Sequence, residues 1–349
     1  VDVRSVTLQK VRYVHLNGAT IDADHVRGRV TITSRRLRVR EFDVTAPQFE
    51  AAGDLRLAAG EPLSMHGRAT GRLRLPRAQL GIDAAVSGPI DRLAIEGVLR
   101  EPQRATLDAL YTRREEGWRL AGEVRSHAFE LDAFLDRPAV SLREVALQFV
   151  ADPEEIRAAG QVGVQEQGSE ERAWDVTLDA RGRYADRLLQ ITSADLALKG
   201  APSRVHASGS IAFAGAAPEL DVAARWTSLQ WPLTGAALVV SERGSGTLRG
   251  AMPYEFTVDA QVEGSALPMM RGEARGRLSR EQLRVDGYRI DALDGVLRGA
   301  GTLRWGTPHA WDLSVSATDV DPAILHSELP GRLSFAAQGS GSDWDRRAD

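Results

Sequence analysis

Short stretches of strictly alternating apolar and polar residues recur along this chain, and glycine or proline sets each of them off. The clearest are residues 174–180, 254–262 and 311–317, of which the first and third have nearly the same sequence. Successive side chains of a β-strand point to opposite faces, so each stretch predicts a strand with one apolar and one polar face. Helical periodicity is rare, and the chain is therefore predicted to be all-β.

Further strands are predicted across the chain by the same pattern, at residues 30–33, 37–44, 93–96, 142–150, 205–213 and 333–338. Only two short helices are expected, over residues 131–136 and 322–329. Pro322 suits the first turn of the second helix and Pro330 ends it.

The predicted strands number roughly two dozen, and open sheets rarely exceed about ten without curling or splitting. Several sandwich modules or one long curled sheet would satisfy this limit. Glycines inside the strands allow sharp bending and favour the curled sheet. The expected fold is a long, curled, antiparallel-rich sheet that forms a taco-like groove with an apolar interior. No linker divides the chain, so residues 1–349 are predicted to be one continuous groove segment.

Composition narrows the functional classes. The 44 basic and 48 acidic residues give a net charge of −4, which argues against nucleic acid as a partner. The absence of cysteine excludes disulfides and thiolate metal sites. No apolar run approaches the ~18–20 residues of a membrane-spanning helix. The chain begins at Val1 inside an alternating stretch, which suggests a piece of a longer protein.

Motifs for catalysis are missing from the sequence. The seven histidines lack metal-ligand spacing, and the adjacent acids at 115–116, 154–155 and 170–171 fall in turn-like stretches. Residues 244–250 are glycine-rich but lack the spacing and the lysine of a phosphate loop. We therefore assign no catalytic residue, no cofactor site and no metal site, and expect a protein that is not an enzyme.

Three ordered blocks resemble the TamB family, the inner-membrane-anchored half of the translocation and assembly module. Residues 224–235 are similar to the family's block of an apolar residue, Trp-Pro, an apolar residue and Thr-Gly. Residues 293–313 and 321–333 follow in the family's order. The similarity is good over residues 190–345, whereas residues 1–190 share only the general character of the family's sequence. The family belongs to the AsmA-like, or repeating β-groove, proteins.

The resemblance implies a groove that spans the periplasm of a Gram-negative bacterium, anchored to the inner membrane by a segment absent here. It implies partnership with a TamA-like outer-membrane barrel through regions outside this fragment, and possible contact with outer-membrane protein precursors. It also implies roles in phospholipid traffic and in the assembly and secretion of outer-membrane proteins and autotransporters.

Phospholipid acyl chains are the predicted occupants of the groove. The side chains expected to line it are the apolar members of the alternating stretches: Trp174, Val176, Leu178, Leu220, Val222, Tyr254, Phe256, Val258, Leu303, Trp305, Trp311, Leu313 and Val315. Two alternatives stay open. The free sheet edges could serve as a chaperone-like scaffold for β-barrel precursors, or the chain could be a structural β-repeat stalk whose apolar face is covered by protein.

Overall fold

The computed structural model describes residues 2–14, 20–47, 49–74, 79–101, 104–115, 117–129, 140–166, 173–213, 217–233, 236–264, 267–305 and 309–342. These residues are almost entirely β-strand, and their single helix is the short 3-10 helix η2 (Pro322–Ile324). The chain forms two compact units, Val1–Val176 and Thr177–Asp349.

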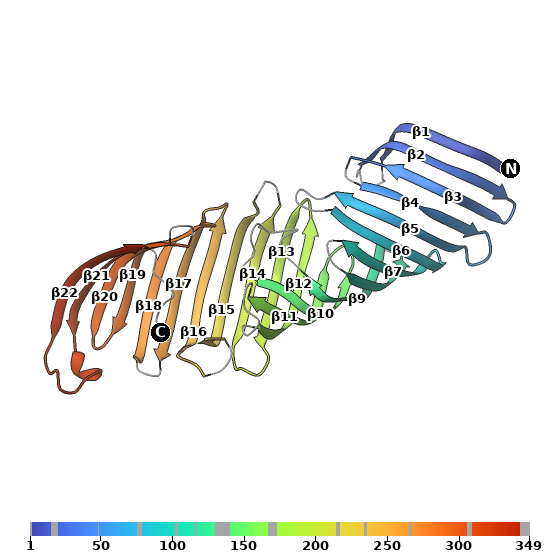
Figure 1. Ribbon diagram of the computed structural model, residues 1–349. Helices are drawn as coiled ribbons and strands as arrows, with labels where there is room; N and C mark the ends of the chain where they lie inside the picture. Colours follow the sequence, from blue (N-terminus) through green and yellow to red (C-terminus); the bar gives the residue numbers. More distant parts are fainter. Residues whose placement is uncertain are drawn as a thin grey trace. The chain divides into compact units, whose positions relative to one another are not determined.

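Unit 1 contains eleven complete strands, and from β1 to β10 each pairs antiparallel with the strand that follows it in the sequence (Figure 1). They are β1 (Asp2–Val14), β2 (Thr20–Thr33), β3 (Arg36–Thr45), β4 (Phe49–Ala58), β5 (Ser64–Arg74), β6 (Gln79–Pro89), β7 (Arg92–Glu101), β8 (Ala105–Arg114), β9 (Gly117–Phe129), β10 (Val140–Ala151) and β11 (Ile156–Glu166). Strand β12 (Ala173–Ala185) crosses the boundary between the units.

Unit 2 repeats this simple order, again with antiparallel pairing between consecutive strands. Its strands are β13 (Leu188–Leu198), β14 (Arg204–Ala212), β15 (Glu219–Trp231), β16 (Val239–Gly250), β17 (Tyr254–Gly264), β18 (Leu267–Leu278), β19 (Gln282–Ala292), β20 (Gly295–Arg304), β21 (Ala310–Val320) and β22 (Leu333–Ser342).

The predicted all-β, antiparallel fold with only short helical structure is confirmed. Each strand predicted above lies in an observed strand, except that residue 213 falls one position beyond β14. The helix predicted over residues 322–329 is wrong in length, because only η2 forms and its Asp321 side chain accepts the Ala323 N–H at 3.0 Å. Seven residues between two prolines are too few to offset the cost of nucleating an α-helix. The helix predicted over residues 131–136 lies outside the described residues.

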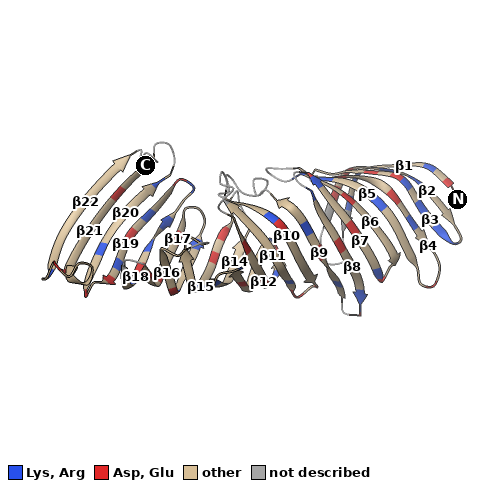
Figure 2. Ribbon diagram, turned by 60° about the horizontal axis from the view of Figure 1, so that its bottom comes forward, with Lys and Arg blue, Asp and Glu red and all other residues tan. Residues whose placement is uncertain are grey.

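The two faces of each sheet are chemically opposite, because the strand register places like residues side by side. In unit 2, Val222 of β15, Leu248 of β16 and Phe256 of β17 occupy one row across the sheet. The adjacent row on the opposite face holds Asp221 and Arg249, whose ion pair measures 3.0 Å. Figure 2 shows the corresponding acidic and basic bands on the strands of both units. We call the two sides the apolar face and the charged face.

Neither unit adds a second layer over its apolar face in the described part of the chain. Extensive contacts between strands join only strands that are consecutive in the sequence. The accessible surface is 23,506 Å², against about 14,000 Å² for a compact monomer of this mass. Apolar-face side chains such as Phe256 and Val258 are consequently only half-buried. The sheets are open and one layer thick.

Bulges interrupt the ladders at positions where the backbone takes a positive φ. Glu41, Glu144 and Asp319 have φ values of 52°, 45° and 56°, and each lies within a register shift. A β-bulge adds a residue to one strand, bends it and increases its local twist. Val145 and Ala317, which lie next to two of these bulges, are among the few buried apolar residues. Bulges therefore create small pockets of packing in a sheet that has no second layer.

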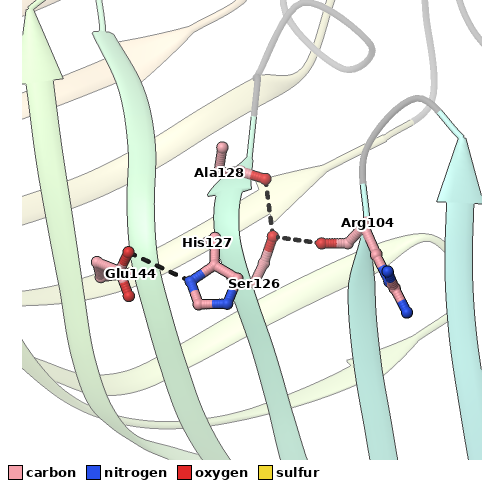
Figure 3. A network of polar contacts seen from close by, with 5 residues as sticks. All are labelled: Arg104, Ser126, His127, Ala128 and Glu144. Carbon is pink, nitrogen blue, oxygen red and sulfur yellow. Dashed lines mark hydrogen bonds and ion pairs between the residues drawn. The ribbon is translucent and has the colours of Figure 1, made fainter.

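The bulge at Glu144 shows how polar groups at such a site find hydrogen-bond partners (Figure 3). Ser126 of β9 lies opposite Val145 and is only 6% exposed. Its Oγ lies 2.7 Å from the Ala128 carbonyl oxygen and 3.0 Å from that of Arg104, so its proton serves two acceptors. His127 Nδ1 lies 3.3 Å from a Glu144 carboxylate oxygen on the exposed side.

Aromatic rings on the apolar face of unit 2 lie over glycines of the next strand. A Cβ added to Gly244 would stand 2.3 Å from Cζ2 of Trp226, and one added to Gly276 would stand 2.9 Å from Cε1 of Phe256. Gly299 lies under Tyr288 in the same way, 2.5 Å from its hydroxyl oxygen, but at Gly276 and Gly299 a backbone carbonyl oxygen is closer still. An added Cβ would stand 1.9 Å from the Arg284 oxygen at Gly276 and 2.0 Å from the Ser314 oxygen at Gly299. Sheets use aromatic side chains to cover strand glycines in this way.

We predict that Gly244→Ala lowers the free energy of unfolding by about 1–3 kcal/mol, the usual cost of overpacking. The new methyl group would displace the Trp226 ring, and denaturant-induced unfolding of the chain measures the effect. Gly272→Ala is the matched control, because its Cβ would meet Ile290 Cγ1 at an ordinary 3.4 Å. Equal losses in the two variants would contradict the role of Gly244 as a seat for the ring.

Candidate functional site

The apolar face of unit 2 is the candidate site, because it carries large apolar side chains on every strand from β13 to β21. The register joins them into continuous rows from strand to strand. They include Leu189, Ile191, Leu196, Val205, Ile211, Leu220, Val222, Trp226, Leu248, Phe256, Val258, Val262, Val285, Tyr288, Ile290, Leu297, Leu303, Trp311, Leu313 and Val315.

Nine of the residues predicted to line a groove lie on this face. They are Leu220, Val222, Tyr254, Phe256, Val258, Leu303, Trp311, Leu313 and Val315. Their exposure varies along the face: Tyr254 is 8% exposed, whereas Leu313 is 44% exposed. The Tyr254 hydroxyl donates to the Pro218 carbonyl at 3.1 Å, which holds that ring at the end of its strand. A contact of any of these side chains with lipid stays a prediction.

The other four predicted residues are placed differently. Trp174, Val176 and Leu178 alternate along β12 with polar residues and are half-buried, but the strand passes from unit 1 into unit 2 between the second and third of them. Trp305 follows the last residue of β20 and is 42% exposed. Its Nε1 donates to the Arg280 carbonyl at 2.6 Å, so it belongs to a strand end.

Sequence reasoning did not assign Trp226 and Tyr288 to this face. Trp226 Nε1 donates to Ser241 Oγ at 2.8 Å, and the Tyr288 hydroxyl donates to the Ser314 carbonyl at 3.3 Å. Both aromatic side chains thus keep a polar partner while the ring covers apolar surface. Burial raises the pKa of the Tyr288 phenol above its ordinary value. The sequence signal for both aromatic residues is the glycine that pairs with each of them on the next strand. It can be recognised only once the strand register is known.

The charged face of unit 2 contains a separate hollow of about 840 Å³ over β14–β19. Short side chains form its floor, including Ser208, Ser245, Thr247 and Thr257. Thr247 and Thr257 stand opposite each other, with their hydroxyl oxygens 2.8 Å apart. Most of its lining belongs to the face opposite Phe256, so this hollow is not the expected apolar groove.

Within the described ranges, no group of three or more His, Asp or Glu side chains is arranged to hold a metal ion. No helix among the described residues has both the length and the apolar character needed to cross a membrane.

Comparison with known proteins matches residues 184–345 to the family model described as TamB, N-terminal domain. The matched range runs from the end of β12 through β22 and contains the apolar face described above. No curated protein and no solved structure matches the chain.

We predict that the folded chain binds the apolar dye 1-anilinonaphthalene-8-sulfonate, and that Val258→Asp weakens dye fluorescence severalfold. The substitution places a charge in the middle of an exposed apolar surface. Thr257→Asp is the control, since it adds the same charge to the same strand on the opposite face. A fluorescence titration at fixed dye concentration compares the two variants. Equal losses, or no dye binding by the parent chain, would show that the apolar face is not open.

Proposed function

We propose that the apolar face of unit 2, which lies within the residues similar to the TamB N-terminal domain, carries phospholipid acyl chains between the inner and outer membranes. The observation that carries the proposal is a strand-to-strand apolar surface with no second layer over it in the described part of the chain. Extended apolar surfaces of this kind mark sites of binding.

The energetics of an acyl chain fit such a surface. Each buried CH₂ group contributes about 0.8 kcal/mol, so a chain of ~16 carbons kept dry gains on the order of 10 kcal/mol. That gain depends on area and has no preferred direction. Aliphatic and aromatic side chains hold the lipid without fixing it at one position, which is what movement along the sheet requires.

The proposed setting follows from the family. The chain would lie in the periplasm of a Gram-negative bacterium, tethered to the inner membrane through another part of the protein. A TamA-like outer-membrane barrel would be its partner. Support for the assembly and secretion of outer-membrane proteins and autotransporters would then be the consequence of lipid supply.

The alternative function is a chaperone-like scaffold for β-barrel precursors, in which an extended segment of a precursor pairs with a free edge of the open sheet. A purely structural stalk would instead require its apolar face to be covered.

In-cell photocrosslinking tests these functions, with a probe at Phe256 and separately at Thr257. The two positions are neighbours on β17 with opposite facing. We expect phospholipid to be captured from Phe256 and not from Thr257, because acyl chains contact only the apolar face. Mass spectrometry of the crosslinked product identifies the captured molecule.

The other outcomes separate the alternatives. Capture of outer-membrane protein precursors alone from Phe256 would support the scaffold. Lipid captured equally from Phe256 and Thr257 would overturn a lipid path confined to one face. The absence of any crosslinked product from both positions would favour a structural stalk.

A further inference from the structure

Three arginines of unit 1 gather on the charged face of that unit. Arg38 of β3 stands directly across from Arg56 of β4, and Arg56 in turn stands across from His66 of β5. Arg68, two residues further along β5, points to the same face. Figure 2 shows basic bands on neighbouring strands at this end of unit 1.

The arrangement is electrostatically unfavourable as it stands. Like charges directly opposite each other on antiparallel strands destabilise the sheet. Some arginines elsewhere on this unit do have carboxylate partners, as in Arg12 with Asp22 at 2.7 Å and Arg29 with Glu41 at 3.4 Å. Arg38, Arg56 and Arg68 form no ion pair with any described residue.

Asp54 is an acidic residue beside these arginines that forms no ion pair with them in the described structure. Asp54 lies across from Arg68, but its Oδ1 accepts the backbone N–H of Glu41 at the β3 bulge, at 3.2 Å. Partial burial lowers the pKa of the Arg38 guanidinium, and the charges of Arg40 and Arg56 lower it further, although Asp54 acts in the opposite direction. The local field around Arg38 is therefore positive, in a chain whose net charge is −4.

A hollow of about 420 Å³ opens between these side chains. Its floor includes small residues of β5–β7, namely Gly67, Ala85 and Ala94, and the three arginines stand around it. The volume is ample for a phosphate group with part of the molecule that carries it. Asp54 and Glu96 also line the hollow and moderate its positive charge.

We propose that this arginine hollow, formed by Arg38, Arg56 and Arg68, binds a phosphate-bearing anion. Guanidinium groups present planar, paired donors that match phosphate oxygens, and such charge-assisted hydrogen bonds are strong. A bound dianion between Arg38 and Arg56 replaces their mutual repulsion with two attractions. The ligand is either a free phosphate compound or the phosphate of a lipid headgroup at a membrane surface. The site shares no residue with the apolar face of unit 2 that is proposed to carry lipid.

Calorimetric titration of the full chain with inorganic phosphate tests the site. We expect saturable binding that weakens as salt rises, because these partly exposed charges are screened. The double variant Arg38→Gln/Arg56→Gln should bind at least tenfold more weakly, and Arg68→Gln should weaken binding to a smaller degree. Unfolding midpoints confirm that each variant folds, and loss of the repulsion predicts that the double variant is at least as stable as the parent chain without phosphate.

The control is Arg12→Gln/Arg249→Gln, which removes the same charge from the same kind of face at arginines that already have carboxylate partners. It should bind phosphate as the parent chain does. Equal weakening in the two double variants would reduce the effect to net charge and overturn the proposal.

Vesicles distinguish the two sources of phosphate. Phosphatidylcholine vesicles with and without phosphatidic acid are compared for the parent chain and for Arg38→Gln/Arg56→Gln. Binding that needs both phosphatidic acid and the two arginines assigns the hollow to a headgroup. Binding of inorganic phosphate alone assigns it to a free compound. If neither phosphate nor phosphatidic acid binds in an arginine-dependent way, the hollow is not an anion site.

Discussion

The structure depends on the alternation of apolar and polar residues along each strand, because this alternation gives a sheet of only one layer two different faces. In a β-sandwich the apolar face of one sheet packs on a second sheet about 10 Å away. Here Val258 and its neighbours meet no such layer in the described part of the chain, and they are half-buried by residues beside them in the same sheet. Apolar surface left in water costs about 25 cal/mol per Å². Such a face therefore favours any apolar occupant.

Lateral packing is what keeps the open sheet ordered. Trp226 over Gly244, Phe256 over Gly276 and Tyr288 over Gly299 pair a large side chain with a vacant position on the next strand. Each ring lies along the sheet and shields backbone that glycine would leave exposed. The ion pairs of the charged face contribute less, because surface salt bridges are worth about 0–1 kcal/mol. Arg249 and Asp221 keep more than half of their side-chain surface exposed, at 63% and 69%.

Much of this fold could be predicted from alternation alone, because residue periodicity is a local property. The stretch at residues 254–262 predicts β17, and the observed strand is Tyr254–Gly264. The bulges could not be predicted in the same way. Glu41 and Glu144 adopt positive φ although glutamate has no preference for it, because the pairing with neighbouring strands forces the backbone there.

The candidate face could be predicted only in part, for a related reason. Alternation identifies Phe256 and Val258 as residues of one face, but it does not say which residue of β16 or β18 lies beside them. From the sequence, glycines inside strands suggest only bending, and the register adds that Gly244 lies directly under the Trp226 ring. Trp305 fits the pattern in sequence yet lies past its strand and bonds to a turn, since the pairing with β21 ends at Arg304.

A one-layer sheet also separates apolar binding on one face from polar binding on the other, with only the backbone between the two faces. On β4, Leu55 and Leu57 point to the apolar face while Arg56, between them, points to the arginine hollow. The side chains of the two faces share only the backbone, so a polar ligand on one face does not compete with an apolar ligand on the other. Changes at sites without shared partners are usually additive in free energy. The charged face can therefore vary in sequence and acquire its own ligands while the apolar face stays continuous.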